Sequence, residues 1–85
     1  MKIQLRFFAS VREALGVSQE EVVLPSSIDT VGKVRDFLQQ RGGVWAETLS
    51  EGRSLRMAYE QQMCGADTVI HDGGEVAFFP PVTGG

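Results

Sequence analysis

Apolar and polar side chains alternate from Lys2 to Phe8 and again from Glu20 to Leu24. A period of two places the apolar side chains of a segment on one face, so each segment is predicted to form a half-buried strand. In the second segment Val22 and Leu24 would share the buried face. Pro25 would end that strand, because proline has no N–H to donate to a sheet.

A longer segment has helical spacing instead. Its apolar positions recur at intervals of three and four residues: Val31, Val34, Phe37 and Leu38. The pattern predicts the main helix of the domain over residues 31–41, with Asp29 or Thr30 as the N-cap and Gly42-Gly43 as the end. We assign Phe37 and Leu38 to the core, together with Phe7, Trp45 and Phe78.

A short helix is predicted between the first two strands. Ser10 and Glu13 have the Ser-x-x-Glu spacing of a capping box, in which each side chain satisfies the other residue's backbone N–H. The helix would run from Val11 to Leu15, end at Gly16 and turn three side chains toward the core: Val11, Ala14 and Leu15.

Shorter elements complete the chain. Residues 45–49 are expected to form a turn or short helix, and strands are expected at 55–59, 62–64 and 75–79, the last one after the turn Asp72-Gly73-Gly74. This order predicts an α+β fold. It is consistent with a β-grasp, or ubiquitin-like, mixed sheet wrapped around one main helix. We therefore expect one domain over residues 1–79 and an extended, flexible tail over residues 80–85.

Composition narrows the functional classes. A chain of 85 residues with a net charge of −3 and a pI near 5.0 fits a single small domain and argues against general nucleic-acid binding. The single cysteine, Cys64, fits a reducing cytoplasm, and neither a leader nor a membrane segment is expected. With one histidine, His71, a metal site is not expected. No nucleophile–base pair stands out, so the chain is not expected to be an enzyme on its own.

The C-terminal segment Phe78-Phe79-Pro80-Pro81-Val82-Thr83-Gly84-Gly85 is the most distinctive part of the sequence. Two prolines end the preceding strand and favour an extended exit from the domain. From Pro80 onward the tail would reach roughly 20 Å, at about 3.3–3.6 Å per residue. Gly84 and Gly85 have no side chains, so the terminal carboxylate could enter a narrow channel in another protein.

This terminus resembles that of the small subunits of molybdopterin synthase, the sulfur carriers of molybdenum cofactor biosynthesis. The resemblance covers essentially the whole chain, because four further motifs fall in the family's order: Phe7-Phe8-Ala9, Val11-Arg12-Glu13, Trp45-Ala46 and Asp72-Gly73-Gly74-Glu75-Val76-Ala77. A terminal Gly-Gly alone is also found in ubiquitin-like modifiers and in the thiamin sulfur carrier.

The resemblance implies a β-grasp fold and a role for the Gly85 carboxylate as the reacting group. A partner adenylating enzyme would consume ATP and Mg²⁺ to form an acyl-adenylate, which becomes a thiocarboxylate. The thiocarboxylate would enter the large subunit of the synthase and donate sulfur to the cyclic pyranopterin precursor, forming the dithiolene. The family usually works as a heterotetramer with two large subunits. This chain would bind no cofactor itself.

Two partners binding one small domain require exposed apolar surface. If Val76 and Phe78 point inward, Ala77 and Phe79 point outward beside the tail. We predict Phe79 as a contact, with Met63, Phe8 and Arg12 as its neighbours in a partner interface. Methionine suits such a surface because its side chain adapts to different partners.

Two alternative functions stay open at this point. The same thiocarboxylate chemistry could supply sulfur to the thiazole of thiamin or to tRNA. The chain could instead be a ubiquitin-like modifier that forms isopeptide bonds through Gly85.

Overall fold

The fold is known from a computed structural model, which describes residues 1–81. Within that range the elements follow in the order β1 (Lys2–Phe7), α1 (Ala9–Leu15), β2 (Gln19–Val23), α2 (Val31–Gln39), α3 (Gly43–Thr48), β3 (Arg56–Tyr59), β4 (Gln62–Cys64) and β5 (Glu75–Phe79). Every strand predicted from the sequence is present, with bounds shifted by at most one residue. The short helix predicted around Trp45 is α3.

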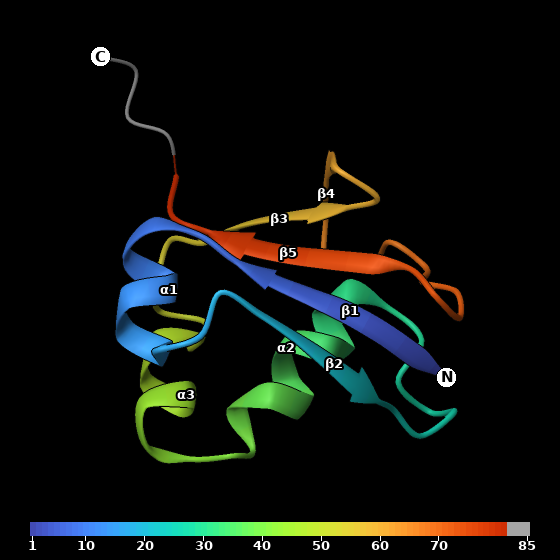
Figure 1. Cartoon of the computed structure of the whole chain (residues 1–85), viewed down its shortest axis with the longest axis horizontal. Helices are drawn as coiled ribbons and strands as arrows, with labels where there is room; N and C mark the ends of the chain where they lie inside the picture. The colour runs from blue at the N-terminus through green and yellow to red at the C-terminus, as the bar shows by residue number, and fades with distance from the viewer. Residues whose placement is uncertain (82–85) are drawn as a thin grey trace.

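The strands form one mixed sheet in the order β2-β1-β5-β3-β4 (Figure 1). β1 and β5 run parallel to each other, whereas the other neighbouring strands are antiparallel. The first and last strands of the chain therefore lie side by side inside the sheet. This is the β-grasp arrangement, and it confirms the fold class expected from the order of elements.

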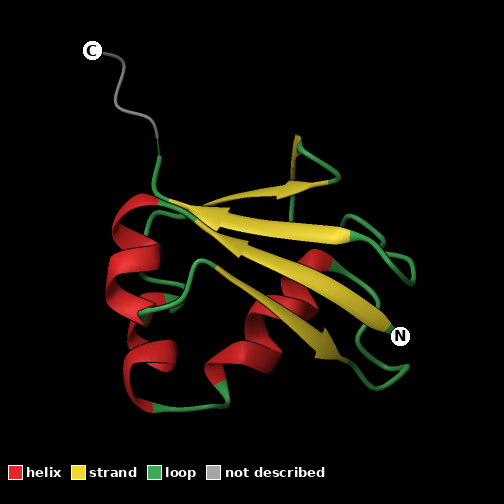
Figure 2. Ribbon diagram, viewed as in Figure 1, coloured by secondary structure: helices red, strands yellow, loops and turns green. Residues whose placement is uncertain are grey.

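All three helices lie on one side of the sheet, and no helix within residues 1–81 covers the other side (Figure 2). The core between the sheet and the helices contains Phe7, Leu38 and Phe78, all at most 1% exposed. Phe37 and Trp45 were also predicted as core, but they are half-buried and pack against its edge. The ring of Trp45 meets that of Phe7 edge-on at 5.6 Å.

The start of α1 differs from the prediction. The helix begins at Ala9 with Phe8 as its N-cap, and no side chain caps it, so the predicted capping box of Ser10 and Glu13 is wrong. The N-cap lies two residues before the predicted Ser10 because Ala9 has a φ of 52°, in the left-handed region, and turns the chain at this point. The carbonyl of Phe8 then accepts the N–H groups of Val11 and Arg12.

The other end of α1 behaves as predicted, since Gly16 takes a left-handed φ of 77°. Val11 and Leu15 are buried, but Ala14 is exposed, contrary to prediction. Val11 and Leu15 are one turn apart and form a narrow buried stripe. Ala14 lies beside that stripe, in a surface hollow that it shares with Val44 and Thr48 of α3.

The main helix α2 is capped by Thr30, whose Oγ1 accepts the N–H of Lys33 at 3.2 Å. Arg35, on the same helix, is a charged residue that is only 7% exposed. Its guanidinium donates to the carbonyls of Leu49 and Ser50 at 2.7 and 2.5 Å. Burial of this charge is compensated by these hydrogen bonds, which fasten the segment after α3 to the main helix.

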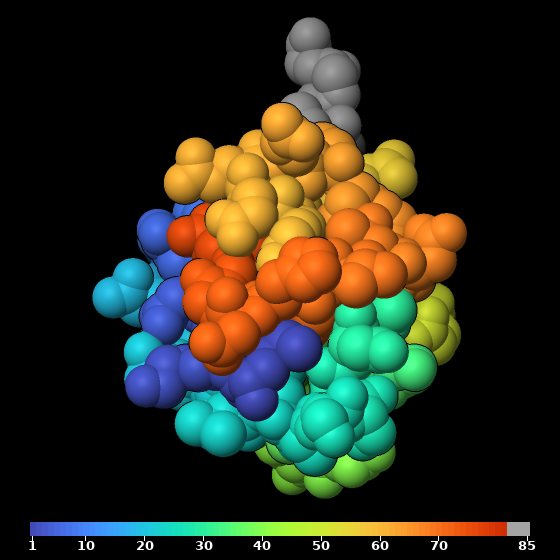
Figure 3. All heavy atoms as spheres, turned by 90° about the vertical axis from the view of Figure 1, so that its right-hand side faces the viewer, coloured from blue at the N-terminus to red at the C-terminus, as the bar shows by residue number. Residues whose placement is uncertain are grey.

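The turn before β5 is set by Asp72, Gly73 and Gly74, as predicted. Gly73 has a φ of 85° and donates its N–H to the carbonyl of Lys2 at 2.7 Å. A Cβ on Gly74 would lie 2.3 Å from the hydroxyl of Tyr59, so the position excludes a side chain unless Tyr59 moves. Figure 3 shows the first residues of the chain lying against this turn.

α2 ends at Gln39, two residues before the predicted boundary. Arg41, which follows the helix, forms an ion pair with Glu20 on β2. Its Nη1 and Nη2 donate to the two carboxylate oxygens at 2.9 and 2.5 Å, and the guanidinium lies 4.3 Å from the centre of the Trp45 ring. This bidentate hydrogen bonding lowers the pKa of Glu20 below its ordinary value of 4.5, although partial burial opposes the shift.

We expect Glu20→Gln to lower the free energy of unfolding by about 0.5–1 kcal/mol near neutral pH. Because the pKa of Glu20 is depressed in the folded state, the ion pair's contribution is complete above the unfolded pKa and is lost as pH falls through the folded pKa. The difference in the free energy of unfolding between wild type and variant should therefore disappear at acidic pH. Urea unfolding at several pH values measures it. A difference that is independent of pH would contradict the ion-pair explanation.

None of the helices formed by residues 1–81 has the length and hydrophobicity needed to cross a membrane.

Candidate partner-docking groove and carrier tail

The base of the C-terminal tail is fixed by contacts between the end of β5 and the start of α1 (Figure 1). The N–H of Phe8 donates to the carbonyl of Phe78 at 3.3 Å. The ring of Phe8 meets that of Phe79 edge-on at 6.5 Å between centroids. Pro80 follows directly and leaves the sheet, since proline cannot continue the hydrogen-bond ladder. The tail thus starts beside two aromatic side chains.

A row of side chains crosses the uncovered face of the sheet next to this point. Strand register places Met63 opposite Ala58, Ala58 opposite Ala77, and Ala77 opposite Arg6. The two central members are alanines, whereas the outer members are long side chains. A trough therefore runs along the middle of this face, because side chains of unequal length stand side by side on the pleated surface.

The trough widens into a groove of about 620 Å³. Its lining is mainly apolar and consists of Phe8, Ala9, Ala58, Gln61, Met63, Glu75, Ala77, Phe79, Pro80 and Pro81. Met63 is 64% exposed and Phe8 is 39% exposed, unusually high fractions for large apolar side chains. The groove ends at the prolines, so a protein that occupies it also lies beside the tail.

Three of the four interface residues predicted from the sequence come together here: Phe8, Met63 and Phe79. Arg12 is exposed on α1 and is not among the lining residues. Sequence reasoning missed Ala58, which forms half of the floor. The signal that could have identified Ala58 is the alternation of side chains along β3, which places this small residue on the same outward face as Ala77.

The groove is bordered by unusual backbone conformations. Ala9 and Gln61, which both line it, have φ values of 52° and 67°, and Glu60 next to Gln61 has a φ of 51°. Non-glycine residues rarely adopt such values, and these conformations tend to occur at functional sites. At Ala9 the conformation turns the chain so that Phe8 faces Phe79. At Glu60 and Gln61 it forms the tight hairpin that carries Met63.

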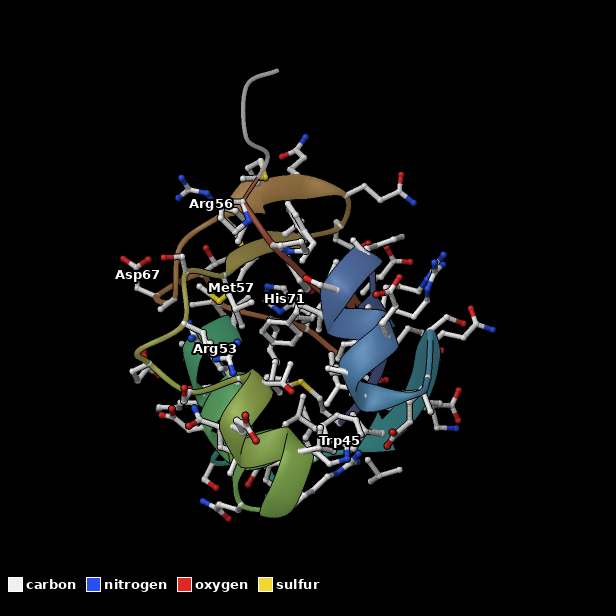
Figure 4. The ribbon with its side chains drawn as sticks, turned by 90° about the vertical axis from the view of Figure 1, so that its left-hand side faces the viewer. Trp45, Arg53, Arg56, Met57, Asp67 and His71 are labelled. Carbon is white, nitrogen blue, oxygen red and sulfur yellow. The ribbon has the colours of Figure 1, made fainter. Side chains whose placement is uncertain are left out.

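Cys64 and His71, the single cysteine and the single histidine of the chain, do not line the groove. Residues 1–81 contain no group of three or more His, Cys, Asp or Glu side chains that could hold a metal ion. Cys64 is half-buried at the end of β4, and His71 lies in the loop before β5 (Figure 4). The predicted tail residues Val82, Thr83, Gly84 and Gly85 lie outside the described residues, so their role rests on the sequence.

Comparison with known proteins places this geometry in a family. The ThiS family profile matches residues 5–85. Two molybdopterin synthase sulfur carrier subunits are similar over nearly their full length. That of Escherichia coli is 41% identical over 83 residues, which make up 98% of this chain and 99% of the relative. That of Haemophilus influenzae is 39% identical with the same coverage.

Solved structures agree on the fold. A putative molybdopterin converting factor subunit 1 from Pyrococcus furiosus superimposes with a TM-score of 0.77 at 25% identity, covering 96% of this chain and 99% of that one. The complex of subunits 1 and 2 of the molybdopterin-converting factor from Helicobacter pylori contains a chain with a TM-score of 0.67 at 22% identity over both full lengths.

The groove beside the tail, the β-grasp fold and the similarity over the whole chain lead to one conclusion. This chain belongs to the ThiS family, and its curated relatives within that family are molybdopterin synthase sulfur carrier subunits.

Proposed function

We propose that this chain is the sulfur carrier subunit of a molybdopterin synthase and that sulfur travels on the carboxyl group of Gly85. The observation that carries the proposal is the groove at the base of the tail, in a chain whose relatives at 39–41% identity have this function. The groove provides a docking surface, and the tail provides the reacting group. The role is that of a non-catalytic subunit.

The chemistry requires activation of the carboxylate, because a carboxylate is a poor acyl donor. An adenylating enzyme would use ATP and Mg²⁺ to form an acyl-adenylate at Gly85 and release pyrophosphate. A persulfide sulfur would then displace AMP, and a thiol would cleave the resulting disulfide to leave the thiocarboxylate. In the large subunit, this group would donate its sulfur to the cyclic pyranopterin precursor. ATP, Mg²⁺ and the catalytic residues would all belong to the partners.

The proposed partners are the adenylating enzyme and the synthase large subunit, in a heterotetramer with two large subunits. A solved complex of subunits 1 and 2 from Helicobacter pylori supports docking of a large subunit on this fold. The site of action would be the cytoplasm, where the single cysteine stays reduced.

Intact-mass spectrometry tests the proposal directly. After incubation with ATP, Mg²⁺, the cognate adenylating enzyme and a persulfide source, the chain should gain the mass of one oxygen-to-sulfur exchange, and fragmentation should place it on Gly85. A second incubation with the large subunit and precursor should reverse it. If Gly85 stays unmodified while a known carrier is loaded in parallel, the proposal fails.

Loss of the sulfur only with a thiazole-forming enzyme or a tRNA-thiolating enzyme would assign the chain to one of the alternative acceptors. Conjugates of higher mass in cell lysate that disappear when Gly85 is deleted would instead support the modifier function.

Filling the groove should block docking without unfolding the domain. Ala77→Leu extends a side chain from the groove floor toward Phe8 and Phe79, on the face that no helix covers. We expect about a tenfold weaker affinity for the large subunit, because the partner loses an apolar contact of about 1.4 kcal/mol in the filled groove. Isothermal titration calorimetry measures the affinity. Val23→Leu is the matched control, since Val23 is 70% exposed on the edge strand β2. Unchanged affinity in Ala77→Leu would exclude the groove from the interface.

A further inference from the structure

Two arginines stand on the uncovered face of the sheet, one on each side of β5. Arg6 on β1 is in register with Ala77, and Arg56 on β3 is in register with Phe79. With strands about 4.8 Å apart and about 3.3 Å per residue, their Cα atoms are roughly 12 Å apart. The line between them crosses β5 at the tail end of the groove. Figure 4 shows Arg56 at the end of the molecule from which the tail leaves.

The guanidinium of Arg6 is held in place but has unused hydrogen-bonding capacity. It lies 5.4 Å from the centre of the Phe8 ring, and its Nη1 is 3.8 Å from a carboxylate oxygen of Glu75. That distance is too long for a hydrogen bond. Its Nε is buried and has no acceptor within the described part of the chain. A planar guanidinium fixed by an aromatic ring is well suited to receive a carboxylate.

Arg56 is exposed, and its guanidinium makes no hydrogen bond or ion pair with any side chain of residues 1–81. The acidic side chain among the groove's lining residues is Glu75, which already faces Arg6. Beside this end of the groove, Arg6 and Arg56 together with Glu75 carry one excess positive charge, in a chain whose net charge is −3. Such local charge favours an acidic partner surface.

We propose that Arg6 and Arg56 receive carboxylates of the synthase large subunit, placed on either side of an apolar side chain that enters the groove. The inference rests on the proposed function and adds the chemistry of the partner's contact surface, which is an apolar group flanked by acidic side chains. Docking would add a second carboxylate beside Glu75 at the terminal nitrogens of Arg6 and would give Arg56 its first one. The two contacts would fix the direction from which the large subunit approaches the tail.

The association rate constant with the cognate large subunit tests this proposal. Stopped-flow fluorescence would compare wild type, Arg6→Gln, Arg56→Gln and the double variant at low and high ionic strength. The control is Lys2→Gln combined with Lys33→Gln, which removes the same charge from the start of β1 and from α2, away from the strand ends beside the tail. At low salt the double arginine variant should associate about tenfold more slowly, whereas the control changes by about twofold at most. The difference should shrink at high salt because the charges are screened.

Three results would overturn the inference. The first is association of the arginine variant at the wild-type rate, the second is a deficit no larger than that of the lysine control, and the third is a deficit that persists undiminished at high salt. Melting curves for all variants exclude unfolding as the cause. If wild type itself failed to bind the large subunit at any salt concentration, the proposed function would fall as well. Equal binding by wild type and the double variant would overturn this inference alone.

Discussion

A chain extended by one residue beyond Gly85 will form no thiocarboxylate, although its domain will be as stable as wild type. Under the proposed function, the carboxyl group of Gly85 is then part of a peptide bond and cannot form the acyl-adenylate, and the carboxylate of the added residue lies one residue beyond the position at which Gly85 would react. The same loss is expected for Gly85→Ala at the transfer step, because a channel shaped for glycine has no room for a Cβ. Thiocarboxylate loading by mass spectrometry and product formation by the reconstituted synthase measure the two steps.

Stability provides the control for this prediction. The buried core and the hydrogen-bonded sheet are formed within residues 1–81, and changes outside such positions usually alter the free energy of unfolding by less than about 0.5 kcal/mol. Both tail variants should therefore have the same melting temperature as wild type. A large fall in melting temperature would show that the terminus supports the domain, and sulfur loading of the extended chain would show that the reacting group is elsewhere.

Phe78→Ala should be the most damaging single substitution in the core, with a loss of about 3–5 kcal/mol in the free energy of unfolding. Phe78 is fully buried on the central strand β5, and its ring stacks on that of Phe7 at 6.2 Å between centroids. Small domains are stable by only about 5–15 kcal/mol, so this loss is a large part of the total. Equilibrium unfolding in urea measures it.

Phe37→Ala is the matched comparison, because it removes the same atoms from a half-buried position at the edge of the core. The sequence alone suggested the full 3–5 kcal/mol cost for Phe37. Since part of its ring is already in contact with water, the structure reduces that expectation to clearly less than the loss at Phe78. Equal losses at the two positions would contradict this ranking.

The sequence by itself determined the order of elements, the β-grasp fold and the special character of the tail. These properties depend on local signals. Alternation identifies β1 and β2, helical spacing identifies α2, and consecutive prolines followed by Gly-Gly mark the C-terminal segment. The side-chain period of two also predicted which face of β5 Phe79 occupies.

Only the tertiary structure decided how residues distant in the sequence meet. Ala58 and Ala77 form a groove floor because β3 and β5 are neighbours in one particular register. The capping signal of Ser10 was overridden because Ala9 turns the chain early, which brings Phe8 against Phe79. Arg35 is buried because the carbonyls of Leu49 and Ser50 lie within its reach. Register, burial and pairing of this kind depend on contacts across the fold, and no single segment of the sequence encodes them.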